Sequence, residues 1–168
     1  MTHLHNPIGA TLAALLAGLA LLACGDDDSD GDQRSAAEIL RALPSTYEYE
    51  PVSEAQEDEV LRQSMPPEGA LEEIKDVEMR RVLRDGEVIG SAMAVVSGRE
   101  LDEDDVLRGF TKGVGGNPGR IELDGKDGRL ASVQGFQMII DVADTEMVVV
   151  AATDAAGVRR LARPLLLD

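Results

Sequence analysis

Residues 74–96, IKDVEMRRVLRDGEVIGSAMAVV, decide the fold. Two runs of strand-like composition flank Arg84-Asp85-Gly86, and an Asp-Gly pair between such runs is a strong signal for a β-hairpin. In the second run large side chains lie on one face of the expected strand and small ones on the other. We expect the large set to meet a core and the small set to let another element approach closely. The two sets are Ile89, Met93 and Val95, and Gly90, Ala92 and Ala94.

A second hairpin is expected further along the chain. Residues 120–123 and 129–142 flank the glycine-bearing turn Asp124-Gly125-Lys126-Asp127-Gly128. A turn at Asp144 then leads to residues 147–152, whose apolar run predicts a buried strand. One face of the run 129–142 is expected to carry Phe136, Met138, Ile140 and Val142.

The first folded elements are expected near Ser35. Ser35 and Glu38 have the spacing of a capping box, which predicts a short helix that Pro44 stops. Residues 47–52 alternate aromatic with acidic side chains, and this pattern indicates an edge strand that Pro51 ends.

Three further helices are predicted from their caps. Ser53 and Gln56 form a second capping box, for a helix that runs to about residue 64. Asp102 or a neighbour caps a helix, and Asp154 caps the last one. The buried positions expected on these two helices are Val106, Leu107 and Phe110, and Val158, Leu161, Ala162 and Leu165. Arg159, Arg160 and Arg163 should stay in water, and Pro164 should fray the final turn.

These elements predict a single α+β domain over residues 35–168. We expect an antiparallel sheet of five to seven strands with helices packed on one face, the C-terminal helix among them.

The net charge, and the absence of histidine and cysteine from most of the chain, exclude several classes of function. The chain has 32 acidic and 16 basic residues, a net charge of −16, so its surface should repel nucleic acid and attract cations or basic partners. The histidines are His3 and His5 and the one cysteine is Cys24, so residues 25–168 contain neither type. This excludes a Ser-His-Asp triad, a Cys-His pair and a His/Cys zinc site from those residues. We expect no cofactor, and the sequence favours a role other than that of an enzyme.

An export segment is indicated at the N-terminus. Residues 8–23 are almost wholly apolar, and residues 1–23 contain no Asp, Glu, Lys or Arg. This apolar run is shorter than the roughly 20 residues that span a bilayer as a helix, and it fits the core of a signal peptide. Residues 25–33 then change abruptly to an acidic stretch, whose like charges predict an extended tether.

Leu21-Leu22-Ala23-Cys24, between these two segments, resembles the lipobox of bacterial lipoproteins. The resemblance implies that signal peptidase II removes residues 1–23 as a signal peptide, and that the thiol of Cys24 carries a diacylglycerol. An added amide-linked chain, such as palmitate, would strengthen the membrane attachment. Residues 24–34 would then be the lipidated cysteine and its tether, on the exported side of the membrane at the cell envelope. In outline the expected domain is similar to small envelope lipoproteins of unassigned activity.

Other motifs fall short of a binding site. Residues 26–31 have the Asp and Gly spacing that opens an EF-hand loop, but its twelfth position is Ala37, where calcium needs a bidentate Glu. Residues 113–119, GVGGNPG, lack the Gly-Lys-Ser/Thr of a P-loop, and they follow a helix where phosphate binding needs one to begin. The acids at 102–105 suit the positive end of a helix dipole. Cys24 is thus the one functional residue predicted, as a lipidation site, with no catalytic, cofactor or metal residues.

The sequence predicts a membrane-anchored, non-enzymatic lipoprotein that binds a partner or serves an accessory role at the cell envelope. Its expected partners are the membrane, through the acyl chains on Cys24, and an envelope protein or small ligand that the sequence does not identify. Two alternatives stay open. A hydrolase could use two placed carboxylates, and a carrier could hold a small apolar ligand between sheet and helices in a pocket lined by methionines.

Overall fold

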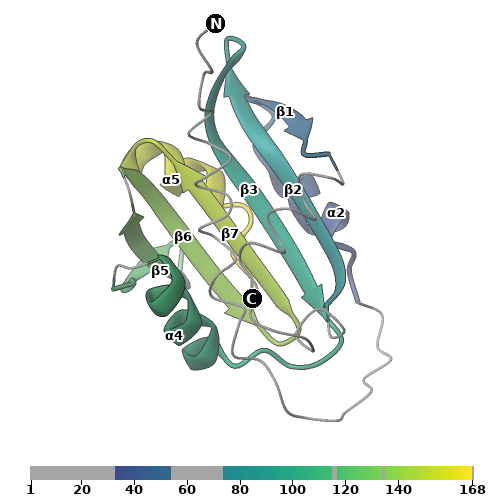
Figure 1. The fold of residues 1–168 in the computed structure, drawn as a ribbon. Coiled ribbons are helices and arrows are strands. Elements are labelled where there is room, and N and C mark those ends of the chain that lie inside the picture. The colour runs from purple at the N-terminus through teal and green to yellow at the C-terminus, as the bar shows by residue number, and fades with distance from the viewer. Residues whose placement is uncertain (1–32, 54–73, 115–116, 134, 168) are drawn as a thin grey trace, which may run out of the picture.

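The computed structural model describes residues 33–53, 74–114, 117–133 and 135–167. They form a seven-stranded antiparallel sheet with helices against it, so the α+β class is confirmed (Figure 1). The strand order is β1-β2-β3-β7-β6-β5-β4, which places the last strand in the middle. The strands are β1 (Glu48–Pro51), β2 (Ile74–Arg84), β3 (Glu87–Ser97), β4 (Gly119–Leu123), β5 (Lys126–Val133), β6 (Phe136–Ala143) and β7 (Glu146–Ala152). The helices are α2 (Ala36–Ile39), the 3-10 turn η2 (Leu40–Ala42), α4 (Glu103–Val114) and α5 (Ala155–Ala162).

The hairpin predicted from residues 74–96 is confirmed as β2 and β3. Asp85 has φ 54° and Gly86 has φ 76°, the left-handed pair that a two-residue turn needs. Near this turn the register shifts, because Val82 pairs with Gly90 whereas Leu83 pairs with Val88. The extra residue, Ile89, packs with the cluster around α2 and α5, so the expectation that it shares a face with Met93 and Val95 is wrong. A β-bulge of this kind has no clear signal in the sequence.

Both faces of the central strands are buried. Along β3, Ala92 and Ala94 belong to one apolar cluster and Met93 and Val95 to another, because successive residues face opposite sides. We call these clusters the first core and the second core. The first core contains Leu40, Val82, Ile139, Val150, Val158 and Leu161 among its buried members. The second contains Met79, Val106, Phe110, Met138, Met147 and Val149.

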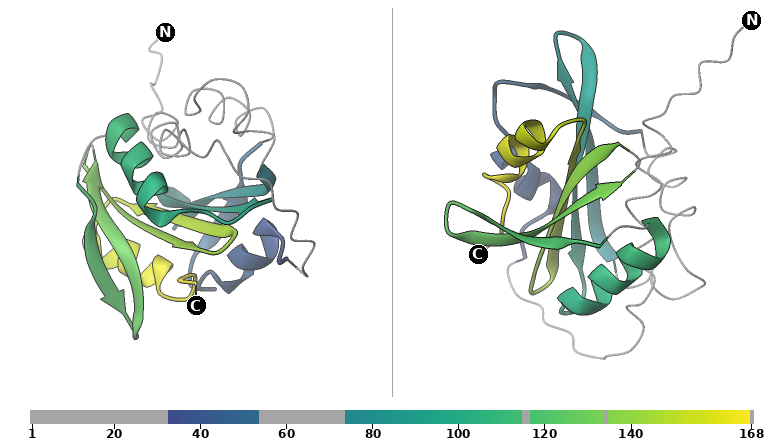
Figure 2. Two further views of the ribbon diagram at one scale, coloured as in Figure 1. Left: turned by 90° about the horizontal axis from the view of Figure 1, so that it is seen from below. Right: turned by 90° about the vertical axis from the view of Figure 1, so that its left-hand side faces the viewer.

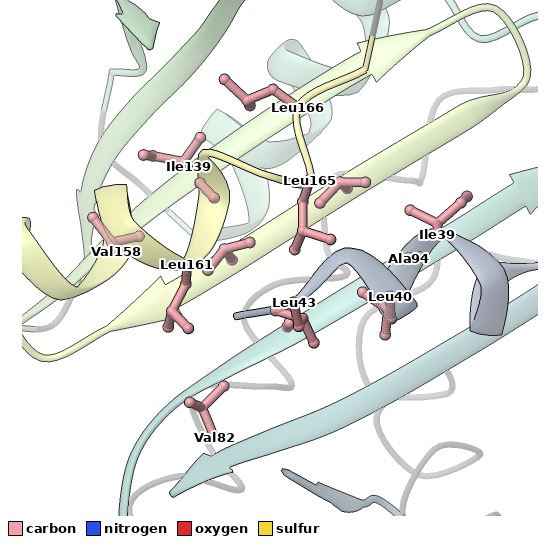
Figure 3. Packing of buried hydrophobic residues seen from close by; sticks show 14 of the residues in the cluster. Ile39, Leu40, Leu43, Val82, Ala94, Ile139, Val158, Leu161, Leu165 and Leu166 are labelled. Carbon is pink, nitrogen blue, oxygen red and sulfur yellow. The ribbon is translucent and has the colours of Figure 1, made fainter. Parts of the chain in front are cut away.

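The helices divide between the two faces (Figure 2). Helices α2 and α5 cover the first core, where Figure 3 shows Leu40 and Leu161 against the sheet. Helix α4 lies on the opposite side, with Val106 and Phe110 buried in the second core. The prediction that helices pack on one face is therefore wrong for α4. The physical reason is that the central strands are apolar on both faces, and each face needs its own cover.

The small residues of β3 have the role expected of them. Ala92 and Ala94 lie in the first core with Ala36 and Leu40, which come from α2 and the following turn. Because the alanine side chains are short, the helical segment approaches the strand closely (Figure 3). This confirms that the small set admits a neighbouring element.

The predicted caps are present in the described residues. Ser35 and Glu38 form a complete capping box on α2. Asp102 accepts a hydrogen bond from the backbone N–H of Asp105 at the start of α4, at 2.9 Å. Asp154 accepts one from Gly157 at the start of α5, at 2.7 Å. The helix predicted from Ser53 to about residue 64 lies largely outside the described residues.

The second hairpin has more strands than expected. Its turn is Asp124-Gly125, with φ 56° and 85°, and residue 126 already begins β5. The predicted strand over residues 129–142 is wrong, because Gly135, at φ 87°, lies at a turn between β5 and β6. The expected turn at Asp144 and the strand after it are confirmed, with Asp144 at φ 48° before β7.

Gly90→Ala should destabilise the domain. An alanine Cβ there would lie 2.3 Å from the backbone oxygen of Ala151. This atom belongs to the backbone of a paired strand, so it cannot move aside as the end of a flexible side chain could. Because Gly90 pairs with Ala152 between the central strands β3 and β7, we expect the free energy of unfolding to fall by about 1–3 kcal/mol. Urea denaturation measures it, with Gly119→Ala as control, since open space surrounds that position. Equal losses in both variants would contradict the packing.

Candidate functional site

A polar groove lies where the described chain begins. It has a volume of about 280 Å³ and opens to solvent. We call it the junction groove, because the first described residues, Gln33 and Arg34, contact the sheet there. Its lining residues are Gln33, Arg34, Ala143, Asp144, Thr145, Glu146 and Leu167. Cys24 itself, the one site residue predicted from sequence, lies outside the described residues.

Two consecutive side chains attach the start of the domain to the groove. The amide of Gln33 donates to the backbone oxygen of Ser97 at 3.3 Å and to the hydroxyl of Thr145 at 3.0 Å. Arg34 forms a bidentate ion pair with Glu146, in which Nε lies 3.1 Å from Oε1 and Nη2 contacts Oε2. The chain is thus held against β3 and β7 two residues before Ser35, where the domain was expected to begin.

Backbone hydrogen bonds hold the β6–β7 turn, which lines the groove. The N–H of Ser97 donates to Thr145 at 2.8 Å, and the N–H of Leu101 donates to Asp144 at 2.6 Å. These bonds tie the β6–β7 turn to the segment that leaves β3 towards α4. The lining residues Asp144 and Thr145 are therefore held in a defined arrangement.

The chemistry of the groove bears on the hydrolase alternative. Asp144 and Glu146 place two carboxylates in one groove, as such an enzyme requires. Both oxygens of Glu146 accept hydrogen bonds from Arg34, however, and the Glu146 side chain is only 13% exposed. An ion pair of this geometry occupies both carboxylate oxygens with hydrogen bonds to the guanidinium. The arrangement suits attachment of the chain better than acid-base catalysis.

The C-terminal segment reaches the same groove. Leu167 lines it, and the N–H of Leu167 donates to Oδ2 of Asp141 at 2.6 Å. Lys126 Nζ donates to the backbone oxygen of Leu166 at 2.9 Å. Burial raises the pKa of Asp141, although the N–H groups of Leu167 and Val142 favour its charged form. Asp141 therefore holds the C-terminal segment through this hydrogen bond, and burial destabilises its ionised form.

The acidic cluster at the start of α4 is occupied by structural contacts. Asp102 caps the helix, Asp105 pairs with Arg108, and Glu103 accepts from Arg129 of β5 at 2.8 Å. In the described ranges, no three His, Cys, Asp or Glu side chains group as metal ligands would. The EF-hand-like residues 26–31 lie outside those ranges.

Both cores bear on the carrier alternative. In the first core Leu40, Val82 and Leu161 are each 0% exposed between the sheet and its helices, and the methionines of the second core, Met79, Met93, Met138 and Met147, are 0–2% exposed. Close packing of this kind fills the interface with the protein's own side chains. A small apolar ligand at that interface would have to displace them.

Comparison with known proteins found no similar protein. The chain matches no protein-family model, no curated protein and no solved structure. Among the described residues, no helix is both long and apolar enough to span a bilayer.

Asp141→Asn should change how stability depends on pH. Because the folded-state pKa of Asp141 is raised, its contribution to stability is complete below the unfolded value of about 3.9 and is lost as pH rises through the folded value. Asparagine can still accept from Leu167 without a buried charge. The variant should therefore gain stability relative to wild type between about pH 4 and 7, measured by urea denaturation across that range.

Asp141→Ala is the matched control for this prediction. It leaves the buried N–H of Leu167 without its acceptor, so we expect a loss of about 1–2 kcal/mol at pH 7. A difference between Asp141→Asn and wild type that stays constant over the pH range would contradict the role of burial.

Arg34→Ala should loosen the start of the domain. The Arg34 side chain is 59% exposed, so we expect a loss of no more than about 1 kcal/mol in global stability. Local opening should increase, since a clamp between residue 34 and β7 is removed. Hydrogen–deuterium exchange by mass spectrometry would show faster exchange in peptides covering residues 33–40. Arg41→Ala is the control, because its ion pair with Glu38 is exposed and spans 3.8 Å; equal exchange in both variants would refute the clamp.

Proposed function

We propose that this chain is an exported lipoprotein, anchored at the cell envelope by acyl chains on Cys24, whose domain has a non-enzymatic binding or accessory role. The observation that carries the proposal is Leu21-Leu22-Ala23-Cys24, which follows a charge-free apolar segment and precedes an acidic one. A single acyl chain binds a membrane only marginally, so a diacylglyceryl cysteine with an added amide-linked chain would supply the stable anchor.

The distance from Cys24 to the domain supports a close attachment. Residues 25–32 separate Cys24 from Gln33, which already contacts the sheet. The nine residue steps from Cys24 to Gln33 reach at most about 30–32 Å in an extended chain. The lipid would therefore hold the junction groove within that distance of the membrane surface.

The net negative charge of the chain favours a domain that does not lie against the bilayer. The formal charge of −16 lies wholly outside residues 1–23, so an anionic lipid surface would repel the exported part of the chain. The same charge favours basic partners over nucleic acid. A binding role fits this surface, and the absence of His and free thiols from residues 25–168 removes the commonest catalytic groups.

The test is the intact mass of the protein extracted from membranes of a bacterial host. Wild type should have the mass of residues 24–168 plus acyl chains, because cleavage and lipidation both take place at Cys24. Cys24→Ser should give either an unprocessed precursor or a soluble form. Ser29→Ala is the matched control: it alters a small hydroxyl residue of the tether, keeps Cys24, and should be processed as wild type is.

One outcome would overturn the proposal. A wild-type chain that retains residues 1–23 and carries no lipid would leave Cys24, His3 and His5 in the protein as free functional groups. Enzyme and metal chemistry at those residues would then become the leading hypotheses.

A further inference from the structure

The two edges of the sheet differ in a way that bears on self-association. An edge strand presents unpaired N–H and C=O groups, which can pair with another chain. At one edge, β1 carries Glu48 and Glu50 and ends with Pro51, and all three are features that protect an edge. At the other edge, β4 (Gly119–Leu123) contains no proline, and its Arg120 and Glu122 are exposed. The β4 edge is the more open of the two.

The register of the β4–β5 hairpin determines which residues of β4 point their backbone groups outward. The two-residue turn Asp124-Gly125 is flanked by the pair Leu123 and Lys126. In such a hairpin the flanking pair is hydrogen-bonded, and hydrogen-bonded and non-hydrogen-bonded pairs alternate from there. The backbone groups of Ile121 therefore bond to β5, whereas those of Arg120 and Glu122 point away from the sheet.

Charges along β4 are poorly matched inside the chain. Arg120 lies opposite Arg129, and Glu122 lies opposite Asp127, so both directly facing pairs have like charges. Like charges in facing positions are destabilising. A diagonal ion pair between Arg120 and Asp127 offsets part of this, with Nε 3.1 Å from Oδ1. Glu122 is exposed and faces the acidic Asp127, so a positive side chain facing it from another strand would be stabilising.

We propose that β4 pairs antiparallel with β4 of a second copy, about a two-fold axis at Ile121, so that the two sheets become continuous. In this register Arg120 faces Glu122 of the second copy, and Glu122 faces its Arg120. Both pairs consist of residues whose backbone groups point outward, so each pair exchanges both N–H···O bonds. The like-charge pairs within each chain then gain opposite charges across the new interface.

Neighbouring registers are excluded by the same residues. A shift of one residue would match outward-pointing backbone groups with inward-pointing ones. A shift that keeps the backbone in phase would place Arg120 opposite itself or Glu122 opposite itself. Because like charges across strands repel, only the register centred on Ile121 satisfies both the hydrogen bonds and the charges.

The interface also covers apolar surface. Ile121 is half-buried and packs against the first core, and the two-fold axis brings it opposite Ile121 of the second copy. Five residues a side are fewer than a standard stable interface uses. The dimer should therefore be weak, with a Kd of about 1 μM or more. The corresponding β1 pairing would place Glu48 opposite Glu50, which repels.

Disulfide trapping in the full chain tests this arrangement. Residues at a non-hydrogen-bonded antiparallel pair have Cα atoms about 4.5 Å apart, within the range of a disulfide. Ile121→Cys should therefore form a covalent dimer when the detergent-extracted protein is oxidised with glutathione disulfide. The controls are wild type, which has only Cys24, and Glu50→Cys, an exposed position on the opposite edge. Both controls should give at least about fivefold less dimer.

Charge reversal sharpens the test. Arg120→Glu and Glu122→Arg, each combined with Ile121→Cys, should weaken trapping about tenfold, because both cross-chain pairs become repulsive. Mixing the two variants in equal amounts should restore it, since the acidic edge of one then faces the basic edge of the other. Glu122→Arg faces Asp127, and Arg120→Glu faces Arg129 in exchange for its ion pair with Asp127. Because that ion pair is exposed, thermal unfolding of both variants should stay close to that of wild type.

Three results would overturn the proposal. They are trapping of Ile121→Cys no stronger than that of Glu50→Cys, trapping unchanged by the reversals, and no recovery on mixing. The dimer uses residues of β4 alone, so it stands or falls independently of lipid at Cys24.

Discussion

The pairing of β7 with β3 is the constraint on which the rest of the structure depends. It joins the β1-β2-β3 side of the sheet to the β6-β5-β4 side, and no other strand pairing links the two sides among the described residues. The two strands are some fifty residues apart, so their pairing closes a long loop and must be supported by burial. That support comes from both faces, because successive residues of β7, such as Val149 and Val150, enter opposite cores.

Burial on both faces explains why the helices divide. An antiparallel sheet with one wet face needs helices on a single side, and the sequence suggested that arrangement. Here Met93 and Val95 of β3 are as fully buried as Ala92 and Ala94, so a second apolar face had to be covered. Helix α4 meets that need over β5–β7, through Val106 and Phe110.

Local features of the fold were predictable and non-local ones were not. The Asp85-Gly86 turn and the caps at Ser35 and Asp154 depend on residues within a few positions of each other, so the sequence displays them directly. The bulge at Ile89 and the division of residues 129–142 into two strands depend on pairing across the sheet. The junction groove was invisible for the same reason: its residues come from positions 33–34, 143–146 and 167, and they share no motif. Gly135, with its positive φ, was the one local sign that residues 129–142 contain a turn.

Both ends of the described chain meet at one groove, so the domain has a groove end and an opposite end at the Asp85-Gly86 turn. Gln33 and Leu167 both line the junction groove, beside the end of β3 at Ser97. Strand β3 runs from there to the Asp85-Gly86 turn, and eleven residues of strand extend about 36 Å. If lipid at Cys24 holds the groove near a membrane, that hairpin tip points away from it, and the β4 edge runs along the side of the domain. Two anchored copies would then share one orientation relative to the membrane, and confinement to a surface raises the effective concentration at which a weak edge-to-edge contact forms.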